Sequence, residues 1–241
     1  MAPESDDILE IKGLTSGYGK LPILHDVNFS VARGSLTSVI GPNGAGKTTL
    51  MSSILNIVNI MAGEIWYEGQ KISDKEPNEI AAMGVGYVPQ SANVFPNMTV
   101  EENLEMGAHT LPKHQQTKEI ESIYQMFPRL RGRIKQKAST LSGGERQMLA
   151  IGSALLPNPR MIILDEPSSG LSPQIMDDVV DSIVQIREKG ATLIWVVEEN
   201  PRQVLSVADM VYVMENGCVK AKSSSRELLE AEDFSQIFLG V

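Results

Sequence analysis

The first residues that could do chemistry form the stretch GPNGAGKT, from Gly41 to Thr48, which fits the pattern G-x-x-x-x-G-K-[ST]. Gly44 and Gly46 would let consecutive backbone N–H groups curl around phosphate oxygens, and the start of a helix adds a positive dipole. Lys47 would neutralise the β and γ phosphates of a nucleotide, and the Thr48 hydroxyl would ligate Mg²⁺. The alternative is a simple glycine turn before a helix. A phosphate-binding loop is favoured because a predicted strand precedes the motif and a predicted helix follows it.

Two carboxylates end the apolar segment MIILDEP, which is predicted to be a buried strand. Asp165 is suited to position Mg²⁺, directly or through water, and Glu166 is suited to act as a general base for water. Apolar strands that end in acids also occur as ordinary exits from a sheet, so this motif alone is weak. Together with the phosphate loop it indicates a site at which water attacks a bound nucleotide.

The stretch LSGGERQ is predicted to start a helix, because Ser142 and Glu145 have the spacing of a capping box. A well-capped helix accounts for these two residues without any ligand. It accounts poorly for Gly143 and Gly144. Glycines inside a cap remove side chains from a helix N-terminus, so that the phosphates of another molecule can approach its N–H groups closely.

The elements that must position these residues begin with strands. ILEIKGL and VNFSVARG have the alternation of strands and are separated by the turn-rich segment TSGYGKLP. LTSVI predicts a strand before the phosphate loop, and TTLMSSILNIV has helical spacing after it. GEIWYEGQKI and VYVMENGCVKA are predicted hairpins that turn at Glu68-Gly69 and Asn216-Gly217.

The segment from about residue 91 to 157 is predicted to be mainly helical, with capping boxes at Thr99 to Glu102 and Ser142 to Glu145. A helix over about 173–189 then separates the predicted strands MIIL and TLIWVV. This order predicts an α/β fold with a mainly parallel sheet core, an N-terminal antiparallel β subdomain and an inserted helical subdomain. We expect one domain over residues 1–241, with its core at about 1–90 and 158–241 and the helical part at about 91–157.

The composition limits the classes of function. The chain has 241 residues, of which 42% are hydrophobic and 21% charged, as is ordinary for a globular protein. The formal net charge of -9 argues against general binding to nucleic acid. Basic side chains alternate through RLRGRIKQK, and a solvated face is favoured there over a local basic patch. The single Cys218 excludes an intrachain disulfide, and no apolar run approaches the roughly 18 residues that span a bilayer.

In chain order, GPNGAGKT, GYVPQ, LSGGERQ and MIILDEP resemble the motifs of ATP-binding-cassette (ABC) ATPases, and the resemblance covers essentially the whole chain. It implies a P-loop NTPase (ABC ATPase) fold, ATP and Mg²⁺ as ligands, and catalysis by Glu166, Gln90 and Lys47. In that family two cassettes face each other head to tail, and each ATP lies between one phosphate loop and the signature motif of the opposite cassette, which is LSGGERQ, residues 141–147, in this chain. Residues 142–144 would therefore contact the partner's ATP.

The resemblance also implies individual contacts. Tyr18, in SGYGK, would stack on adenine, although a plain strand-end tyrosine is the alternative. Gln90, at the end of GYVPQ, would sense the γ-phosphate and its water. The implied metal ligands are Thr48, Gln90 and Asp165. The implied nucleotide contacts are Tyr18, Gly41, Pro42, Asn43, Gly44, Ala45, Gly46, Lys47, Thr48, Thr49, Ser142, Gly143, Gly144 and Glu199.

The sequence departs from the family at the end of LIWVVEEN. Most members carry a histidine there that donates a hydrogen bond to the γ-phosphate, whereas this chain has Glu199. An ionised carboxylate cannot donate, and it would repel the phosphate unless it is protonated or turned away. We therefore expect slow hydrolysis at the site on Lys47 and more turnover at the partner's site. Ser172 stands where the family often carries an aspartate that reaches across the dimer. The intact Glu166 argues against a dead cassette.

The phrases VFPNMTVEENL, FPRL and DEPSSGLSP resemble the ATPases of importers for branched-chain and other hydrophobic amino acids, in particular the second of two non-identical ATPase subunits. This resemblance implies a peripheral protein on the cytoplasmic face of the cell membrane. Its partners would be transmembrane permease subunits and a second ABC ATPase, a paralogue or a second copy, and not nucleic acid. Phe95, Pro96 and Met98 either contact a membrane subunit or belong to the core of the helical part, and the sequence favours neither.

Two other functions stay open. One is an ABC ATPase of DNA repair, translation or cofactor assembly. The compact, acidic chain with one cassette disfavours it, because those relatives commonly carry tandem cassettes, coiled-coil insertions or basic surfaces. The other is a nucleotide-controlled switch without productive hydrolysis, which Glu199 favours and Glu166 opposes.

Overall fold

The computed structural model describes residues 6–91, 93–171, 173–198 and 201–230. Its first sheet is antiparallel and has the strand order β2-β1-β4-β5. Its strands are β1 (Asp7–Tyr18), β2 (Leu21–Ala32), β4 (Asn59–Tyr67) and β5 (Gln70–Lys71). The second sheet has the order β10-β9-β3-β8-β7-β6. Its strands are β3 (Leu36–Ile40), β6 (Val85–Val88), β7 (Met161–Asp165), β8 (Thr192–Val197), β9 (Met210–Glu215) and β10 (Cys218–Ser224).

Neighbouring strands in the second sheet run parallel, except that β10 pairs with β9 in the antiparallel direction. The fold class is therefore the predicted one, an α/β protein with a mainly parallel sheet and an N-terminal antiparallel sheet. The parallel part follows from the chain order, because strands joined through helices return to the same end of the sheet.

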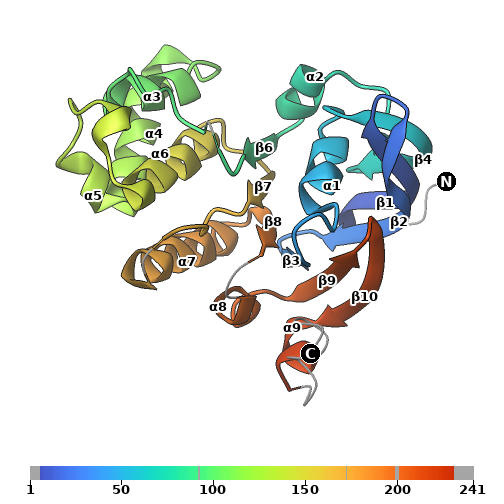
Figure 1. Cartoon of the computed structure of the whole chain (residues 1–241). Coiled ribbons are helices and arrows are strands. Elements are labelled where there is room, and N and C mark those ends of the chain that lie inside the picture. The colour runs from blue at the N-terminus through green and yellow to red at the C-terminus, as the bar shows by residue number, and fades with distance from the viewer. Residues whose placement is uncertain (1–5, 92, 172, 199–200, 231–241) are drawn as a thin grey trace.

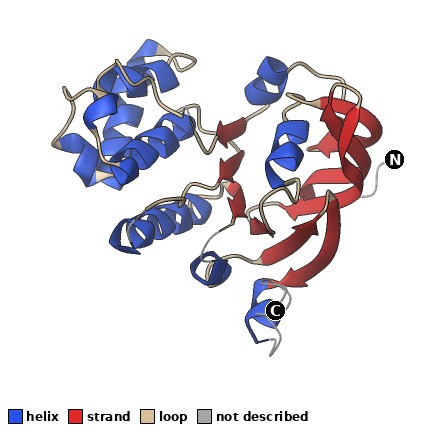
Figure 2. Cartoon of the chain, viewed as in Figure 1, coloured by secondary structure: helices blue, strands red, loops and turns tan. Residues whose placement is uncertain are grey.

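The helices α3 to α6 form a group of their own. They lie between β6 and β7 in the chain and, in Figure 1, away from the strands of the antiparallel sheet. Figure 2 shows that this group is free of strands. The helices are α1 (Lys47–Ile54), α2 (Pro77–Ala82), α3 (Val100–Gly107), α4 (Lys113–Met126), α5 (Pro128–Arg131), the 3-10 helix η1 (Ala138–Thr140), α6 (Gly143–Leu155), α7 (Pro173–Glu188), α8 (Pro201–Leu205) and α9 (Ser225–Glu230). The proposed subdomain limits at about 91 and 157 stay a prediction.

The parallel sheet is buried on both faces, which explains why its strands read as unbroken apolar runs. On β8, Leu193, Trp195 and Val197 belong to a core shared with the helices of the α3–α7 side. Ile194 and Val196 point the other way, into a core shared with α1 and the antiparallel sheet. The period of two along the strand therefore assigns alternate residues to two different cores.

The register of the parallel strands brings their carboxyl ends to one edge. Ile40 at the end of β3 pairs with Val197 at the end of β8. Val196 pairs in turn with Asp165 at the end of β7, and Leu164 pairs with Val88 at the end of β6. The segments that follow these strands include the predicted phosphate loop and the predicted catalytic acids, so the sheet itself gathers them at one edge.

Most local predictions are confirmed, and one is wrong. Asn216 and Gly217 form the tight turn between β9 and β10 with φ values of 49° and 74°. The segment TSGYGKLP was expected to separate β1 from β2 as a long turn, but it is largely strand. Tyr18 pairs with Leu21, so the turn contains two residues only. Gly19, with a φ of 58°, permits that tight reversal.

Candidate active site

The stretch from Gly41 to Thr48 forms the loop between β3 and α1. Gly44 has a φ of 79° and open space where a Cβ would lie, and Gly46 at the helix N-cap has a φ of 98°. Both values lie in the left-handed region that favours glycine. The loop is also held from outside, since the Gly217 N–H donates to the Ala45 carbonyl over 3.0 Å. The motif therefore adopts a fixed, curved backbone in front of a helix N-terminus.

Lys47 is buried, with 4% of its surface exposed. Its Nζ donates to the carbonyl oxygens of Gly41 and Pro42 at 2.8 and 3.2 Å. The same Nζ lies 3.8 Å from Glu166 Oε1. The ammonium group thus sits inside the loop and is within reach of the acid at the end of β7.

Asp165 is held by two hydroxyl groups from other elements. Thr48 Oγ1 donates to its Oδ1 at 3.4 Å, and Tyr87 Oη donates to its Oδ2 at 3.2 Å. Burial raises the pKa of Asp165, and the hydrogen bonds of Thr48 and Tyr87 and the charge of Lys47 offset this in part. A buried carboxylate with hydroxyl neighbours is an oxygen donor set that fits a hard cation.

Tyr87, on β6, is a site residue that sequence reasoning missed. Burial raises its pKa, and the charge and hydrogen-bonding of Asp165 raise it further, with a smaller contribution from Tyr18. Its phenol therefore stays protonated and serves as a donor to Asp165. The signal was its place in GYVPQ, on the strand that ends just before Gln90, but the partner could be found only by folding the sheet.

Glu166 follows directly after β7 and has a φ of 49°, a strained value for a residue with a side chain. Gln90 Nε2 donates to its Oε2 at 2.7 Å, although the two residues follow different strands. Glu166 is 8% exposed. Strain of this kind clusters at functional sites, and here it aims a carboxylate at both Gln90 and Lys47.

The end of β8 also reaches the phosphate loop. Asn43 Nδ2 donates to Glu198 Oε1 in a short contact. This ties the exposed part of the loop to the strand end at which the sequence departs from the family. Glu199, and likewise Ser172, lie outside the described residues.

The predicted adenine contact, Tyr18, ends β1 and is 57% exposed. Thr49 is buried on α1, whereas Thr48 beside it is exposed. The position of Tyr18 leaves its ring accessible to a planar ligand, whereas Thr49 is buried within α1.

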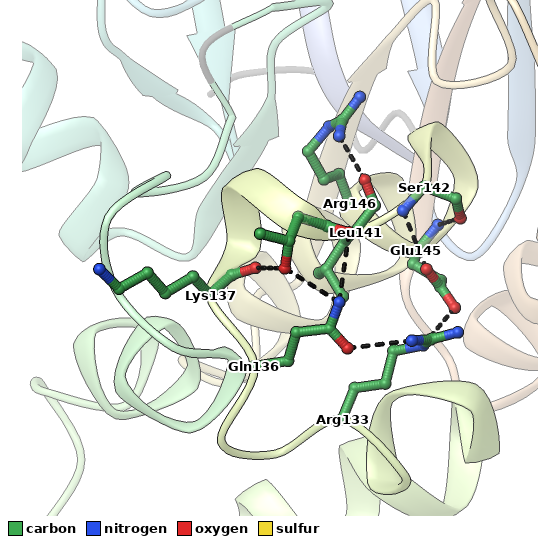
Figure 3. Close-up of polar contacts among 8 residues, drawn as sticks. Arg133, Gln136, Lys137, Leu141, Ser142, Glu145 and Arg146 are labelled. Carbon is green, nitrogen blue, oxygen red and sulfur yellow. Dashed lines mark hydrogen bonds and ion pairs between the residues drawn. The ribbon is translucent and has the colours of Figure 1, made fainter.

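The helix α6 begins at the predicted signature. Ser142 Oγ accepts from the Glu145 N–H at 3.3 Å, and Glu145 Oε2 accepts from the Ser142 N–H at 2.9 Å, so the capping box is complete (Figure 3). Ser142 and Gly143 are exposed. Among the described residues a Cβ on Gly143 would meet only Leu171 at 3.8 Å, whereas a Cβ on Gly144 would lie 2.2 Å from Ile175 Cγ2. The absence of a side chain at 144 is therefore explained by packing against α7, and that at 143 is not explained by any residue that the structure describes.

The signature helix is also joined to the segment after Gln90. Asn93 Nδ2 donates to Gln147 Oε1 at 3.0 Å, and Asn103 Oδ1 accepts from the Phe95 N–H at 2.8 Å. Phe95 is 53% exposed, and Pro96 is exposed as well. The ring of Phe95 is therefore surface and not core, while its backbone is anchored to the helical group.

A P-loop fold in which a buried lysine, two strand-end acids and a glutamine converge defines a nucleotide-hydrolysing ATPase. The model of the ABC transporter family matches residues 24–169. The chain belongs to this family: it is an ABC ATPase, in which ATP hydrolysis is coupled to transport. Cassettes of this family dimerise and pair with transmembrane subunits in transporter complexes. None of the helices within the described ranges is long and apolar enough to cross a membrane.

Several relatives span nearly the whole chain. It is 39% identical to the probable branched-chain amino acid transport ATP-binding protein LivF of Archaeoglobus fulgidus, over 95% of this chain and 97% of the relative. It is 38% identical to the high-affinity branched-chain amino acid transport ATP-binding protein BraG of Pseudomonas aeruginosa, over 97% of this chain and 100% of the relative. The probable LivG protein of Archaeoglobus fulgidus is 30% identical, over 97% of this chain and 95% of the relative. A solved nucleotide-free cassette from an ABC transporter is 28% identical, with a TM-score of 0.84 over 96% of this chain and 98% of that chain.

Proposed function

We propose that this chain is the ATP-hydrolysing subunit of an importer for branched-chain or other hydrophobic amino acids. The observation that supports the substrate is its identity of 39% and 38% to two proteins named for branched-chain amino acid transport, each matched over nearly its full length. The amino acid would bind other subunits, and this chain would supply the motion.

Within the site, the roles follow from the contacts. The backbone from Gly41 to Thr49 would hold the phosphates of ATP, and Tyr18 would stack on adenine. Lys47 would turn from the carbonyl oxygens of its own loop to phosphate oxygens, which are stronger acceptors for an ammonium group. Glu166 would accept a proton from the attacking water, and Gln90, which holds that carboxylate at 2.7 Å, would orient it.

Mg²⁺ fits the oxygen donors at the end of β7. Thr48 Oγ1 and Asp165 Oδ1 lie 3.4 Å apart, so both could face one ion, with Gln90 as a further ligand. Among the described residues no group of three or more His, Cys, Asp or Glu side chains is arranged for a metal. A small number of protein ligands is sufficient for Mg²⁺, because the ion keeps several waters and also binds phosphate oxygens of the nucleotide.

A head-to-tail dimer would complete each site with Ser142, Gly143 and Gly144 of the facing cassette. Gly143 supports this arrangement, because it is exposed and none of the residues described in the structure requires a glycine there. Archaeoglobus fulgidus has both a LivF and a LivG protein, and this chain is 39% identical to the first and 30% to the second. The facing cassette would be such a paralogue or a second copy of this chain.

The complex would lie at the cytoplasmic face of the cell membrane, with this chain as a peripheral subunit. Transmembrane permease subunits would dock on the exposed segment that contains Phe95 and Pro96, whose backbone is fixed to α3 through Asn103. The acidic chain, at a net charge of -9, gives no support to a nucleic acid partner.

Two measurements test this function. Affinity purification of the tagged chain from membranes is expected to bring down two membrane proteins and a second cassette, whereas purification with ribosomes or nucleic acid would overturn the transport role. Deletion of the gene is expected to abolish uptake of labelled leucine, isoleucine or valine, and the wild-type chain but not Glu166→Gln should restore it. Unchanged uptake of all three amino acids would reject the proposed substrate class. It would not affect the conclusion that the chain is an ATPase.

A further inference from the structure

The basic run between Arg129 and Lys135 is neutralised residue by residue. Its ion pairs are Arg129–Asp178, Arg131–Glu121, Arg133–Glu145 and Lys135–Glu101. The side chains of the first two acids are more than two-fifths exposed and that of Glu101 is 35% exposed, but that of Glu145 is only 11% exposed. One pair of the four therefore has a sheltered carboxylate, and it is the pair that reaches the signature helix.

Glu145 has two partners at once. Its Oε2 accepts from the Ser142 N–H, which completes the capping box, while its Oε1 lies 2.5 Å from Arg133 Nε (Figure 3). Burial raises the pKa of Glu145, but the hydrogen bonds of Ser142 and the charge of Arg133 outweigh it and the pKa is lowered. Glu145 is thus a full negative charge in the first turn of α6.

A negative charge at this place has opposite effects on the helix and on a ligand. It stabilises the helix, because the N-terminus carries the positive end of the dipole. It weakens the same N-terminus as a site for phosphates, because like charges repel and a sheltered charge is poorly screened. Since the proposed function has Ser142 and Gly143 receive the phosphates of the facing cassette's ATP, the carboxylate needs a counter-charge.

Arg133 is held in position to supply that charge. Its Nη1 donates to Gln136 Oε1 at 2.9 Å, and Gln136 Nε2 donates to Thr140 Oγ1 at 2.9 Å. The Gln136 carbonyl accepts from the Val100 N–H at 3.0 Å, which fixes the segment to the start of α3. The guanidinium group is therefore held by Gln136 through Nη1 while its Nε faces Glu145.

We propose that Arg133 is a positioning residue for ATP bound to the facing cassette: it neutralises Glu145, so that this carboxylate orders the signature helix without repelling the phosphates. The inference rests on the proposed head-to-tail dimer. It differs from a plain structural ion pair in one respect, because here the charge of Glu145 becomes harmful once Arg133 is removed.

The test removes the charges of Arg133 and Glu145, alone and together, in the complete transporter purified from membranes. Arg133→Gln is expected to raise the ATP concentration that gives half-maximal hydrolysis by about threefold to tenfold, which is the size of charge effects at helix ends. Glutamine at 145 can still cap the helix. The double variant Arg133→Gln/Glu145→Gln should therefore return to within about twofold of the wild type.

The controls separate charge from structure. Arg131→Gln removes the same charge from the same run, beside an exposed acid, and should leave the half-maximal concentration unchanged. Arg133→Lys keeps the positive charge, so its half-maximal ATP concentration should stay close to that of the wild type. Thermal unfolding of each chain identifies variants that simply fail to fold, and Arg133→Lys and the double variant keep the test decisive in that case.

Two outcomes would overturn the role of Arg133 alone, and a third would overturn the proposed dimer contact as well. If Glu145→Gln raises the half-maximal concentration as much as Arg133→Gln, or if the double variant is no better than Arg133→Gln, the ion pair only holds the loop in shape. Gly143→Ala serves as the reference for the contact itself. If it leaves the ATP dependence unchanged, the proposed dimer contact fails, and the role of Arg133 fails with it.

Discussion

Gln90 Nε2 donates a hydrogen bond of 2.7 Å to Glu166 Oε2, joining residues that lie 76 positions apart in the chain. Each follows a different strand, β6 or β7, and the parallel pairing of these strands places them at one edge. The contact unites the residue expected to accept a proton from water with the residue expected to orient it. Gln90 also begins the segment that runs to the exposed Phe95. Movement of that segment would therefore shift Gln90 and the Glu166 carboxylate that it holds.

Removal of the Glu166 carboxylate should stop hydrolysis without stopping ATP binding. Glu166→Gln is expected to lower single-turnover hydrolysis at its own site by about 100-fold or more, the usual effect of losing a general base. Gln90→Ala should lower it by a smaller factor of about 10- to 100-fold, since Glu166 would remain but be less well held. Rapid-quench measurement with labelled ATP, beside a binding titration, distinguishes lost chemistry from lost affinity. Equal rates for Glu166→Gln and the wild type would exclude the residue as the base.

The same variant tests the asymmetry of the two sites. The acid at position 199, which lies outside the described residues, predicts that the site on Lys47 turns over slowly. Glu166→Gln should then reduce turnover of the complete transporter less than the matching change in the partner cassette. Glu199→His should raise turnover by about tenfold or more if a donor at that place contacts the γ-phosphate. An unchanged rate for Glu199→His would mean that the side chain points away from the phosphate.

The buried Asp165 should cost stability at neutral pH. Burial raises its pKa in the folded chain. Between the unfolded-state pKa and this raised value the unfolded chain binds fewer protons at this group than the folded chain, so stability falls as the pH rises from the first value through the second. Asp165→Asn is therefore expected to abolish hydrolysis and yet raise the free energy of unfolding at pH 7.5 by about 1 kcal/mol. The gain should vanish in acid, where Asp165 is protonated.

Thermal unfolding of Asp165→Asn from acid pH to pH 7.5 tests whether the substitution raises stability as the pH rises. Asp181→Asn is the control, because Asp181 is exposed on α7. The prediction is wrong if Asp165→Asn lowers stability at pH 7.5 or if the two variants behave alike.

The two glycines of the signature should respond differently to alanine. Gly144→Ala places a Cβ 2.2 Å from Ile175 Cγ2 and should reduce the free energy of unfolding by about 1–3 kcal/mol, with partial recovery in Gly144→Ala/Ile175→Ala. Within the described ranges Gly143→Ala meets only Leu171, at 3.8 Å, and it should leave the isolated chain as stable as the wild type. Hydrolysis by the complete transporter should nevertheless fall. A loss of stability in Gly143→Ala would contradict the intermolecular explanation of that glycine.

Local features were determined by the sequence, because each depends on residues close together in the chain. The phosphate loop needs its own glycines at positive φ, the capping boxes join Ser142 to Glu145 and Thr99 to Glu102, and the turn at Asn216-Gly217 needs two residues that tolerate positive φ. The unbroken apolar runs determined the class of fold, since a parallel sheet is buried on both faces. The long turn expected between β1 and β2 failed because strand pairing, which is not local, extended to Tyr18.

Only the tertiary structure decided which distant groups meet. Thr48 and Asp165 are 117 positions apart, and Asn43 and Glu198 are 155 apart, yet strand register brings each pair into contact. The donor role of Tyr87, the packing of Gly144 on Ile175 and the pairing of Arg133 with Glu145 likewise depend on how helices and strands pack. Sequence spacing fixes neighbours within a turn or a helix, whereas register and packing arise from the burial of whole faces, and these brought the parts of the site together.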